Sequence, residues 1–310
     1  MIPKDVFQKV RRIQITTSRM VTDVFAGQYH SVFKGRGMEF DEVREYQPGD
    51  DIRSIDWNVT ARTGRPHIKK YVEERELSVM ILVDASASCQ FATVNQLKSR
   101  LAAEIASLLA FSAIRNNDKV GLVIFTDRVE KYLPARKGLK NVLRVVREVL
   151  YFQPRRPGTD ITEALEFLSK VTTRRCVVFV ISDFLEPPAP KSELVTASVD
   201  TTSLRTALSI ADRRHDVIAV TLTDPREKDL PDCGLITIED AETGEQAVVD
   251  TSEKRVREIY RQEASSRLQR RNRLFASVGV DHIELTTDAP YLNEMVKFFL
   301  KRRRRLRHAS

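Results

Sequence analysis

Cysteine is scarce in this chain. Only three are present among 310 residues, and Cys89, Cys176 and Cys233 stand far apart, with no Cys-x-x-Cys pair and no histidine beside them. This spacing excludes a disulfide framework and a zinc site, and it is typical of proteins from a reducing compartment. The stability of the fold is therefore expected to come from a hydrophobic core, which a chain of this length can build.

Long hydrophobic runs are lacking as well. The most apolar helical stretch, residues 101–114, is interrupted by Glu104. It is shorter than the about 20 apolar residues that a bilayer-spanning helix needs. The first residues of the chain, 1–14, are basic but contain no apolar run, so they do not have the pattern of a signal peptide. Both absences favour a cytoplasmic location.

Motifs of several enzyme classes are absent too. The chain has no phosphate-binding GxxxxGKS or GxxxxGKT loop, no GxSxG nucleophile elbow and no histidines at metal-ligand spacing. The segment from Asp84 to Ser86 also lacks the second aspartate of an aspartate-based phosphatase. We therefore predict that the protein is not an enzyme.

The net charge of +8 is concentrated at one end of the chain. Residues 301–307 carry six of these charges, which leaves +2 for the remainder. A nearly neutral body argues against a specific nucleic-acid partner. We interpret residues 301–310 as a solvated, disordered basic tail. The alternative is an adaptor that attaches weakly through this tail to RNA or to an anionic membrane surface.

The first 76 residues differ from the rest in their pattern of apolar and charged side chains. Residues 3–25 carry apolar side chains at loose helical spacing, and residues 35–76 interleave apolar with many charged side chains. The segment 47–50 (QPGD) is a turn signal between two strand-like pieces, and Trp57 is expected to anchor them. We therefore assign residues 1–76 to an N-terminal helix and a small β-rich subdomain.

From residue 77 onward the pattern alternates between strand and helix. Such alternation predicts an α/β domain over residues 77–300, with a mostly parallel sheet flanked by helices on both faces. A hairpin is expected across residues 235–249. The expected strands are 77–83, 119–125, 176–181, 216–222 and 280–285, and the expected helices are 97–114, 138–150, 161–171, 204–213, 253–276 and 291–300.

Oxygen-bearing side chains follow two of the buried strands. Asp84, Ser86 and Ser88 come directly after the first strand, and Asp183 follows the strand at 176–181. Thr159 opens a helix after a Pro-Gly pair. Ligands of such sheets bind outside the carboxyl ends of the strands, so we predict one divalent-cation site formed by these five residues. The alternative is that the Asp-x-Ser-x-Ser segment caps a helix.

The chemistry of this set suits Mg²⁺ or Mn²⁺. Mg²⁺ is a hard cation that prefers about six oxygen ligands and keeps several waters. Serine and threonine hydroxyls are neutral ligands, so an ion that they hold stays short of anionic ligands. It can then accept a carboxylate from outside, which predicts a metal-dependent protein-interaction module.

The spacing of these residues resembles the metal-ion-dependent adhesion site of von Willebrand factor A domains. That resemblance implies direct contacts from Ser86 and Ser88, Thr159 close to the ion, and Asp84 and Asp183 acting largely through water. Cys89 and Pro157 depart from it, since methionine and glycine are usual there. Four further segments resemble the bacterial family called domain of unknown function fifty-eight: residues 35–41 (GRGMEFD), 44–53 (REYQPGDDIR), 55–58 (IDWN) and 61–62 (AR).

Members of this family usually lie beside MoxR-type AAA+ ATPases, which are thought to assemble or activate other proteins. The resemblance therefore implies a MoxR-type ATPase, or the client protein that it remodels, as the partner. It also implies a von Willebrand A-like, Rossmann-like sheet for the main domain.

Overall fold

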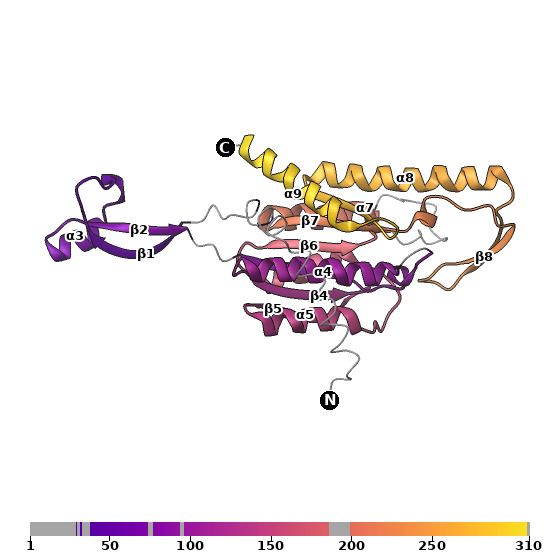
Figure 1. Ribbon diagram of the computed structural model, residues 1–310, viewed down its shortest axis with the longest axis horizontal. Helices are drawn as coiled ribbons and strands as arrows, with labels where there is room; N and C mark the ends of the chain where they lie inside the picture. Colours follow the sequence, from indigo (N-terminus) through magenta and orange to yellow (C-terminus); the bar gives the residue numbers. More distant parts are fainter. Residues whose placement is uncertain are drawn as a thin grey trace, which may run out of the picture.

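The computed structural model describes residues 29, 32, 38–73, 77–93, 96–185 and 199–308. The core of the described chain is a six-stranded sheet (Figure 1). Its strands are β3 (Ser78–Asp84), β4 (Lys119–Phe125), β5 (Val129–Arg136), β6 (Val177–Ser182), β7 (Asp216–Thr223) and β10 (Asp281–Thr286).

The strand order of this sheet reverses between β3 and β6. Across the sheet the order is β10-β7-β6-β3-β4-β5. Neighbouring strands are parallel except for β5, which pairs antiparallel with β4 at one edge. This is the topology of doubly wound α/β folds, and it confirms the predicted, mostly parallel von Willebrand A-like sheet. Ligands of such folds bind at the reversal, outside the carboxyl ends of the strands.

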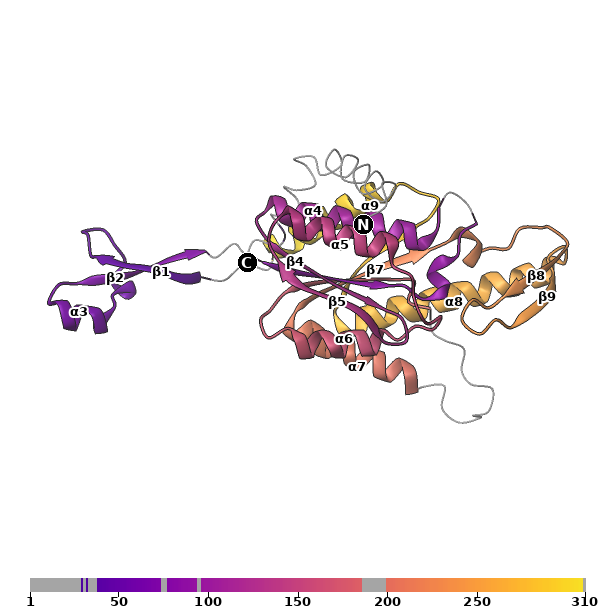
Figure 2. The same cartoon turned by 90° about the horizontal axis from the view of Figure 1, so that it is seen from below.

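Among the described residues, three helices cover each face of the sheet (Figure 2). The helices predicted between residues 97 and 300 are confirmed, although several ends differ. None of the helices within the described ranges is long and apolar enough to cross a membrane. One face carries α4 (Lys98–Arg115), α5 (Leu139–Tyr151) and α9 (Tyr291–His308), and the other carries α6 (Ile161–Val171), α7 (Val199–Arg214) and α8 (Lys254–Val278).

Strand β3 shows why a central strand has an almost unbroken apolar sequence. Val79 and Ile81 belong to the core on the side of α4, whereas Met80 and Leu82 belong to the core on the side of α6. Because both faces are covered, every position of β3 after the first is buried. Pairing with β4 on one side and β6 on the other then fixes where the strand ends, at Asp84.

Strand β5 was not expected from the sequence. Its eight residues, VEKYLPAR, include a proline and three charged residues, and among them Leu133 is the one buried side chain. A half-exposed edge strand tolerates proline because one side of its backbone needs no partner. Such a strand carries no apolar run that could reveal it.

Helix α9 continues through the basic residues to His308, where we expected a solvated, disordered tail. Arg302 is buried and forms ion pairs with Asp216 and Asp281, and Arg305 also pairs with Asp281 at 2.5 Å. These aspartates begin β7 and β10. The expectation was therefore wrong for this part of the tail, because two of its arginines neutralise carboxylates at the amino end of the sheet.

The described part of the N-terminal region is a hairpin with a short helix in its loop. Strands β1 (Met38–Glu45) and β2 (His67–Glu73) pair antiparallel, and η1 (Ile52–Ser54) and α3 (Trp57–Thr63) lie between them. Trp57 is 69% exposed, so its expected role as an anchor was wrong. The helix predicted over residues 3–25 lies outside the described residues.

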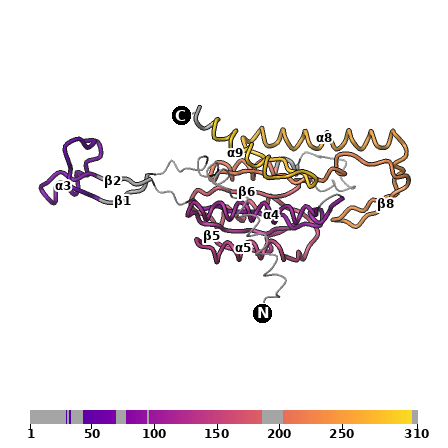
Figure 3. Tube along the Cα trace, viewed as in Figure 1, coloured from indigo at the N-terminus to yellow at the C-terminus, as the bar shows by residue number. Residues whose placement is uncertain are grey.

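Two hairpins lie at opposite ends of the sheet (Figure 3). The first, β1–β2, precedes the amino end of β3. The second follows β7 and consists of β8 (Leu235–Glu239) and β9 (Gln246–Asp250), which pair antiparallel as predicted. It lies at the carboxyl end, the same end as Asp84 and the predicted cation site.

Candidate metal-binding site

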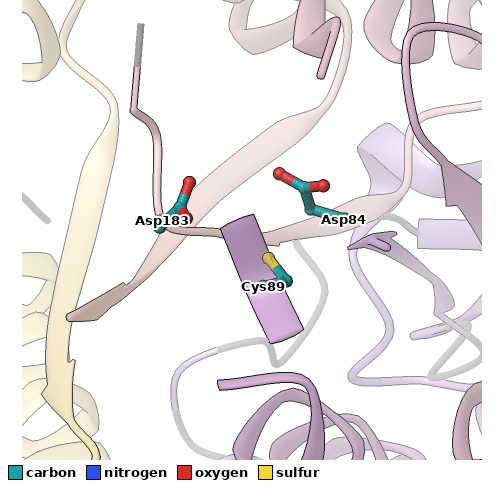
Figure 4. A group of neighbouring side chains, drawn as sticks. All are labelled: Asp84, Cys89 and Asp183. Carbon is teal, nitrogen blue, oxygen red and sulfur yellow. The ribbon is translucent and has the colours of Figure 1, made fainter. Parts of the chain in front are cut away.

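Two aspartates meet where the strand order reverses. Asp84 ends β3, Asp183 follows β6, and these strands are neighbours in the sheet. Both side chains are 1% exposed. Their carboxylates and the thiol of Cys89 each offer one atom, and these three atoms lie within 4.8 Å of one another (Figure 4). The structure thus brings together two of the five predicted ligand residues from segments almost 100 positions apart.

Asp84 is a buried carboxylate whose hydrogen-bond partners are neutral groups. Its Oδ1 accepts a hydrogen bond from the Ser86 backbone N–H at 2.9 Å, and its Oδ2 accepts one from Ser182 Oγ at 2.6 Å. Among the described residues it takes part in no ion pair. Burial raises the pKa of Asp84, and the charge of Asp183 raises it further, although the bonds from Ser182 and Ser86 act in the opposite direction.

The two serines lie in the loop that leaves β3. Ser86 is fully buried, and its Oγ lies 3.1 Å from Ser88 Oγ. Ser86 occupies the N-cap position of the short helix η2 (Ala87–Gln90), yet its side chain makes no capping hydrogen bond. Helix capping therefore does not account for this hydroxyl, which remains beside Ser88 and close to Asp84.

Thr159 lies in the neighbouring loop. The Ala87 backbone N–H donates to the Pro157 carbonyl at 2.9 Å, which ties this loop to the serine loop. Proline at 157 therefore does not prevent the two loops from meeting. The Thr159 hydroxyl donates to Glu242 Oε1 at 2.8 Å, so its partner in this structure is a carboxylate from the β8–β9 turn.

Glu242 was not anticipated from the sequence, because it lies 83 positions from Thr159 in a turn with no motif of its own. Burial raises the pKa of its carboxyl group, the bond from Thr159 opposes that effect, and the nearby charges of Asp183 and Asp240 raise it further. Glu242 is therefore within electrostatic reach of Asp183.

Lys98 is a second residue of the site that sequence reasoning missed. Its ammonium group is fully buried and lies 2.7 Å from Asp183 Oδ2 and 2.5 Å from Glu227 Oε1. Burial alone would lower the pKa of Lys98, but the two carboxylates outweigh burial and raise it. Lysine at the start of a helix is normally solvated, so its sequence position gives no sign of this role.

The charges of the site are therefore unequally balanced. Asp183 already has a cationic neighbour in Lys98, whereas none of the ion pairs among the described residues includes Asp84. An uncompensated buried carboxylate is costly, and a cation beside it removes that cost. The donor set of Asp84, Ser86 and Ser88 consists of oxygens, which suits a hard cation such as Mg²⁺. The residues present thus fit a divalent ion at the Asp84 side of the site.

Cys89 faces the same space, and it is fully buried. Burial and the charges of Asp84 and Asp183 raise the pKa of its thiol well above the ordinary value. Burial and these charges therefore disfavour the thiolate, which is the form in which cysteine binds a metal.

This chain is similar to known proteins over most of its length. An uncharacterized protein from Mycobacterium tuberculosis strain H37Rv is 30% identical over 299 residues, covering 95% of this chain and 89% of that protein. Among solved structures, BatB from Bacteroides thetaiotaomicron is 14% identical, with 74% of this chain and 99% of that chain covered and a TM-score of 0.44. The SpRpn10 VWA domain is 12% identical, with 71% and 94% covered and a TM-score of 0.37.

The family match extends over most of the described chain. The family described as "Protein of unknown function DUF58" matches residues 42–270. That range includes the motif segments from residue 44 onward and all five predicted ligand residues. This confirms the resemblance seen in the sequence, and the chain belongs to the DUF58 family.

Proposed function

We propose that this protein is a non-enzymatic interaction module that binds a carboxylate of a partner protein through Mg²⁺ or Mn²⁺. The observation that carries the proposal is the Asp84 carboxylate, which is buried, has no cationic partner among the described residues and lies beside two serine hydroxyls. Ser86 and Ser88 would contact the ion directly, Thr159 would lie close to it, and Asp84 and Asp183 would act largely through water. A bound ion supplies the positive charge that Asp84 lacks.

The described side chains of the site include no activated nucleophile, which supports a binding role. Cys89 is the described side chain of the site with the most nucleophilic atom, and the raised pKa of its thiol is the opposite of what a nucleophilic cysteine requires. The hydroxyls of Ser86 and Ser88 bind each other and are not paired with a histidine. This arrangement favours holding a cation over covalent catalysis.

The family resemblance supports a MoxR-type AAA+ ATPase, or its client protein, as the source of the carboxylate. The alternative function, an adaptor that uses the basic tail, has less support. Arg302 and Arg305 are engaged with Asp216 and Asp281, so these two charges are partly neutralised within the chain. A tail-dependent complex would therefore rest on the remaining basic residues.

Binding to a MoxR-type ATPase from the same genome tests the proposal. We expect a complex in Mg²⁺ that weakens in EDTA, and a similar loss with Ser86→Ala. Ser99→Ala is the matched control, because its hydroxyl bonds to the exposed Gln90 side chain outside the predicted ligand set. A complex that survives both EDTA and Ser86→Ala would show that the interface lies elsewhere.

A further inference from the structure

The tip of the β8–β9 hairpin is a turn that fixes the backbone of one glutamate. Asp240 Oδ1 accepts hydrogen bonds from the backbone N–H groups of Glu242 at 2.9 Å and Thr243 at 3.0 Å. The Asp240 carbonyl accepts another from Gly244 at 2.8 Å. Gly244 has a φ of 73°, which favours glycine. The position of Glu242 is therefore set by the turn itself, although the turn lies at the surface.

Glu242 is the residue of this turn that reaches the predicted site. It is half-buried, whereas its neighbours Ala241 and Thr243 are exposed. Its Oε1 accepts the hydrogen bond from Thr159 Oγ1 at 2.8 Å. Since Thr159 is one of the five proposed ligand residues, the chain places a carboxylate of its own at the rim of the site.

The rest of the hairpin is attached mainly at its base. There Thr251 Oγ1 donates to the Gly234 carbonyl at 2.7 Å. Along the strands, Leu235 and Val248 are 72% and 71% exposed, and neither strand packs closely along another described helix or strand. The hydrogen bond from Thr159 to Glu242 thus connects the tip of the hairpin to the predicted site.

We propose that Glu242 occupies the position that a partner's carboxylate takes at this site, so that the hairpin must move aside before the partner binds. This inference rests on the proposed function, and it makes Glu242 an internal competitor. The chemistry is the same as that of the partner group, because both are carboxylates. The charge of Asp183 raises the pKa of Glu242, and a cation beside these acidic groups would offset the repulsion between them.

When an internal group occupies a binding site, the apparent affinity for an external ligand equals the intrinsic affinity multiplied by the fraction of molecules in which the site is open. If Glu242 occupies the position about nine-tenths of the time, removing its charge raises the apparent affinity for a carboxylate about tenfold. Glu242→Gln keeps an oxygen that can accept from Thr159 but removes the charge. Glu239→Gln is the matched control, because this exposed glutamate of the same hairpin bonds to Gln246 instead.

Acetate serves as the carboxylate probe, and Mn²⁺ as the metal. Protein-bound Mn²⁺ accelerates the NMR relaxation of the acetate methyl group when acetate reaches the ion. We expect weak relaxation with the wild type and with Glu239→Gln, and an apparent acetate affinity about tenfold higher with Glu242→Gln. Mn²⁺ binding is measured separately on the same samples, and circular dichroism verifies that each variant is folded.

The outcomes separate this inference from the function on which it rests. If Mn²⁺ binds but acetate relaxes equally with the wild type and with Glu242→Gln, the internal competitor is refuted and the metal site stands. If Glu239→Gln behaves like Glu242→Gln, the effect is one of hairpin charge, and the assignment to Glu242 is overturned. If no Mn²⁺ binds to any variant, the proposed function fails and this inference fails with it.

Discussion

Lys98→Met removes the cation that pairs with the Asp183 carboxylate inside the site. The methionine keeps a similar length of side chain, so the main loss is that of the ammonium group. Its two partners, Asp183 and Glu227, remain in place, and Asp183 is buried. Removing one member of a buried ion pair costs about 3–5 kcal/mol, because the remaining charge is left uncompensated. Domains are stable by only about 5–15 kcal/mol, so the loss is a large fraction of the total.

For a domain of this size, each kcal/mol shifts the melting temperature by about 2–4 °C. Thermal unfolding in EDTA should therefore show a melting temperature lowered by about 6–20 °C in Lys98→Met. Mg²⁺ should restore part of the lost melting temperature, since it supplies positive charge near Asp183, which no longer has the Lys98 ammonium group beside it. The Mg²⁺-induced rise should thus be larger in the variant than in the wild type.

Lys297→Met is the matched control for this experiment. Lys297 also pairs with a glutamate, Glu294 at 2.7 Å, but its side chain is 70% exposed. Exposed pairs of this kind contribute about 0–1 kcal/mol, so its melting temperature should change by a few degrees at most. If Lys98→Met unfolds at the same temperature as Lys297→Met, the buried ion pair does not stabilise the fold as reasoned here. If Mg²⁺ raises both by the same amount, the ion does not act near Asp183.

Two further predictions concern residues away from the site. Burial lowers the pKa of His215, and Arg214 and Arg175 lower it further, so the unfolded chain binds this proton more readily than the folded one. The free energy of unfolding should then fall as the pH drops below about 6.5. Urea titrations at several pH values should show a weaker pH dependence in His215→Gln than in the wild type. An equal pH dependence in both proteins would contradict the role given to His215. Arg302→Met removes charged bonds to the aspartates that begin β7 and β10 and should cost about 1.5–3 kcal/mol in urea unfolding; an unchanged midpoint would mean that the end of α9 contributes no stability.

The sequence was sufficient to predict the parallel strands of the sheet and the meeting of Asp84 with Asp183. Strands β3 and β6 are buried on both faces, so each appears as a continuous apolar segment, and Asp84 and Asp183 mark the points where those segments end. Parallel strands present their carboxyl ends at the same edge, which is why residues almost 100 positions apart could be expected to meet.

Other features depend on tertiary contacts that no local pattern encodes. Lys98 meets Asp183 and Glu227 across 85 and 129 positions, and nothing in its own neighbourhood distinguishes it from a solvated lysine. Glu242 likewise lies in a turn whose sequence contains no motif that would predict its contact with Thr159. The edge strand β5 lacks an apolar run, and the exposure of Trp57 shows that a large aromatic residue need not anchor a core.

Direct measurement of Mn²⁺ binding by electron paramagnetic resonance tests the central claim, namely a divalent-cation site at Asp84. Asp84→Asn keeps the shape of the side chain and removes its charge. Asp51→Asn makes the same change at the exposed cap of η1, in the hairpin at the opposite end of the sheet. We predict that the wild type and Asp51→Asn bind one Mn²⁺ with equal affinity and that Asp84→Asn binds it at least about tenfold more weakly, a loss of about 1.4 kcal/mol. Equal affinity in Asp84→Asn and Asp51→Asn, or no binding to the wild type, would contradict the account.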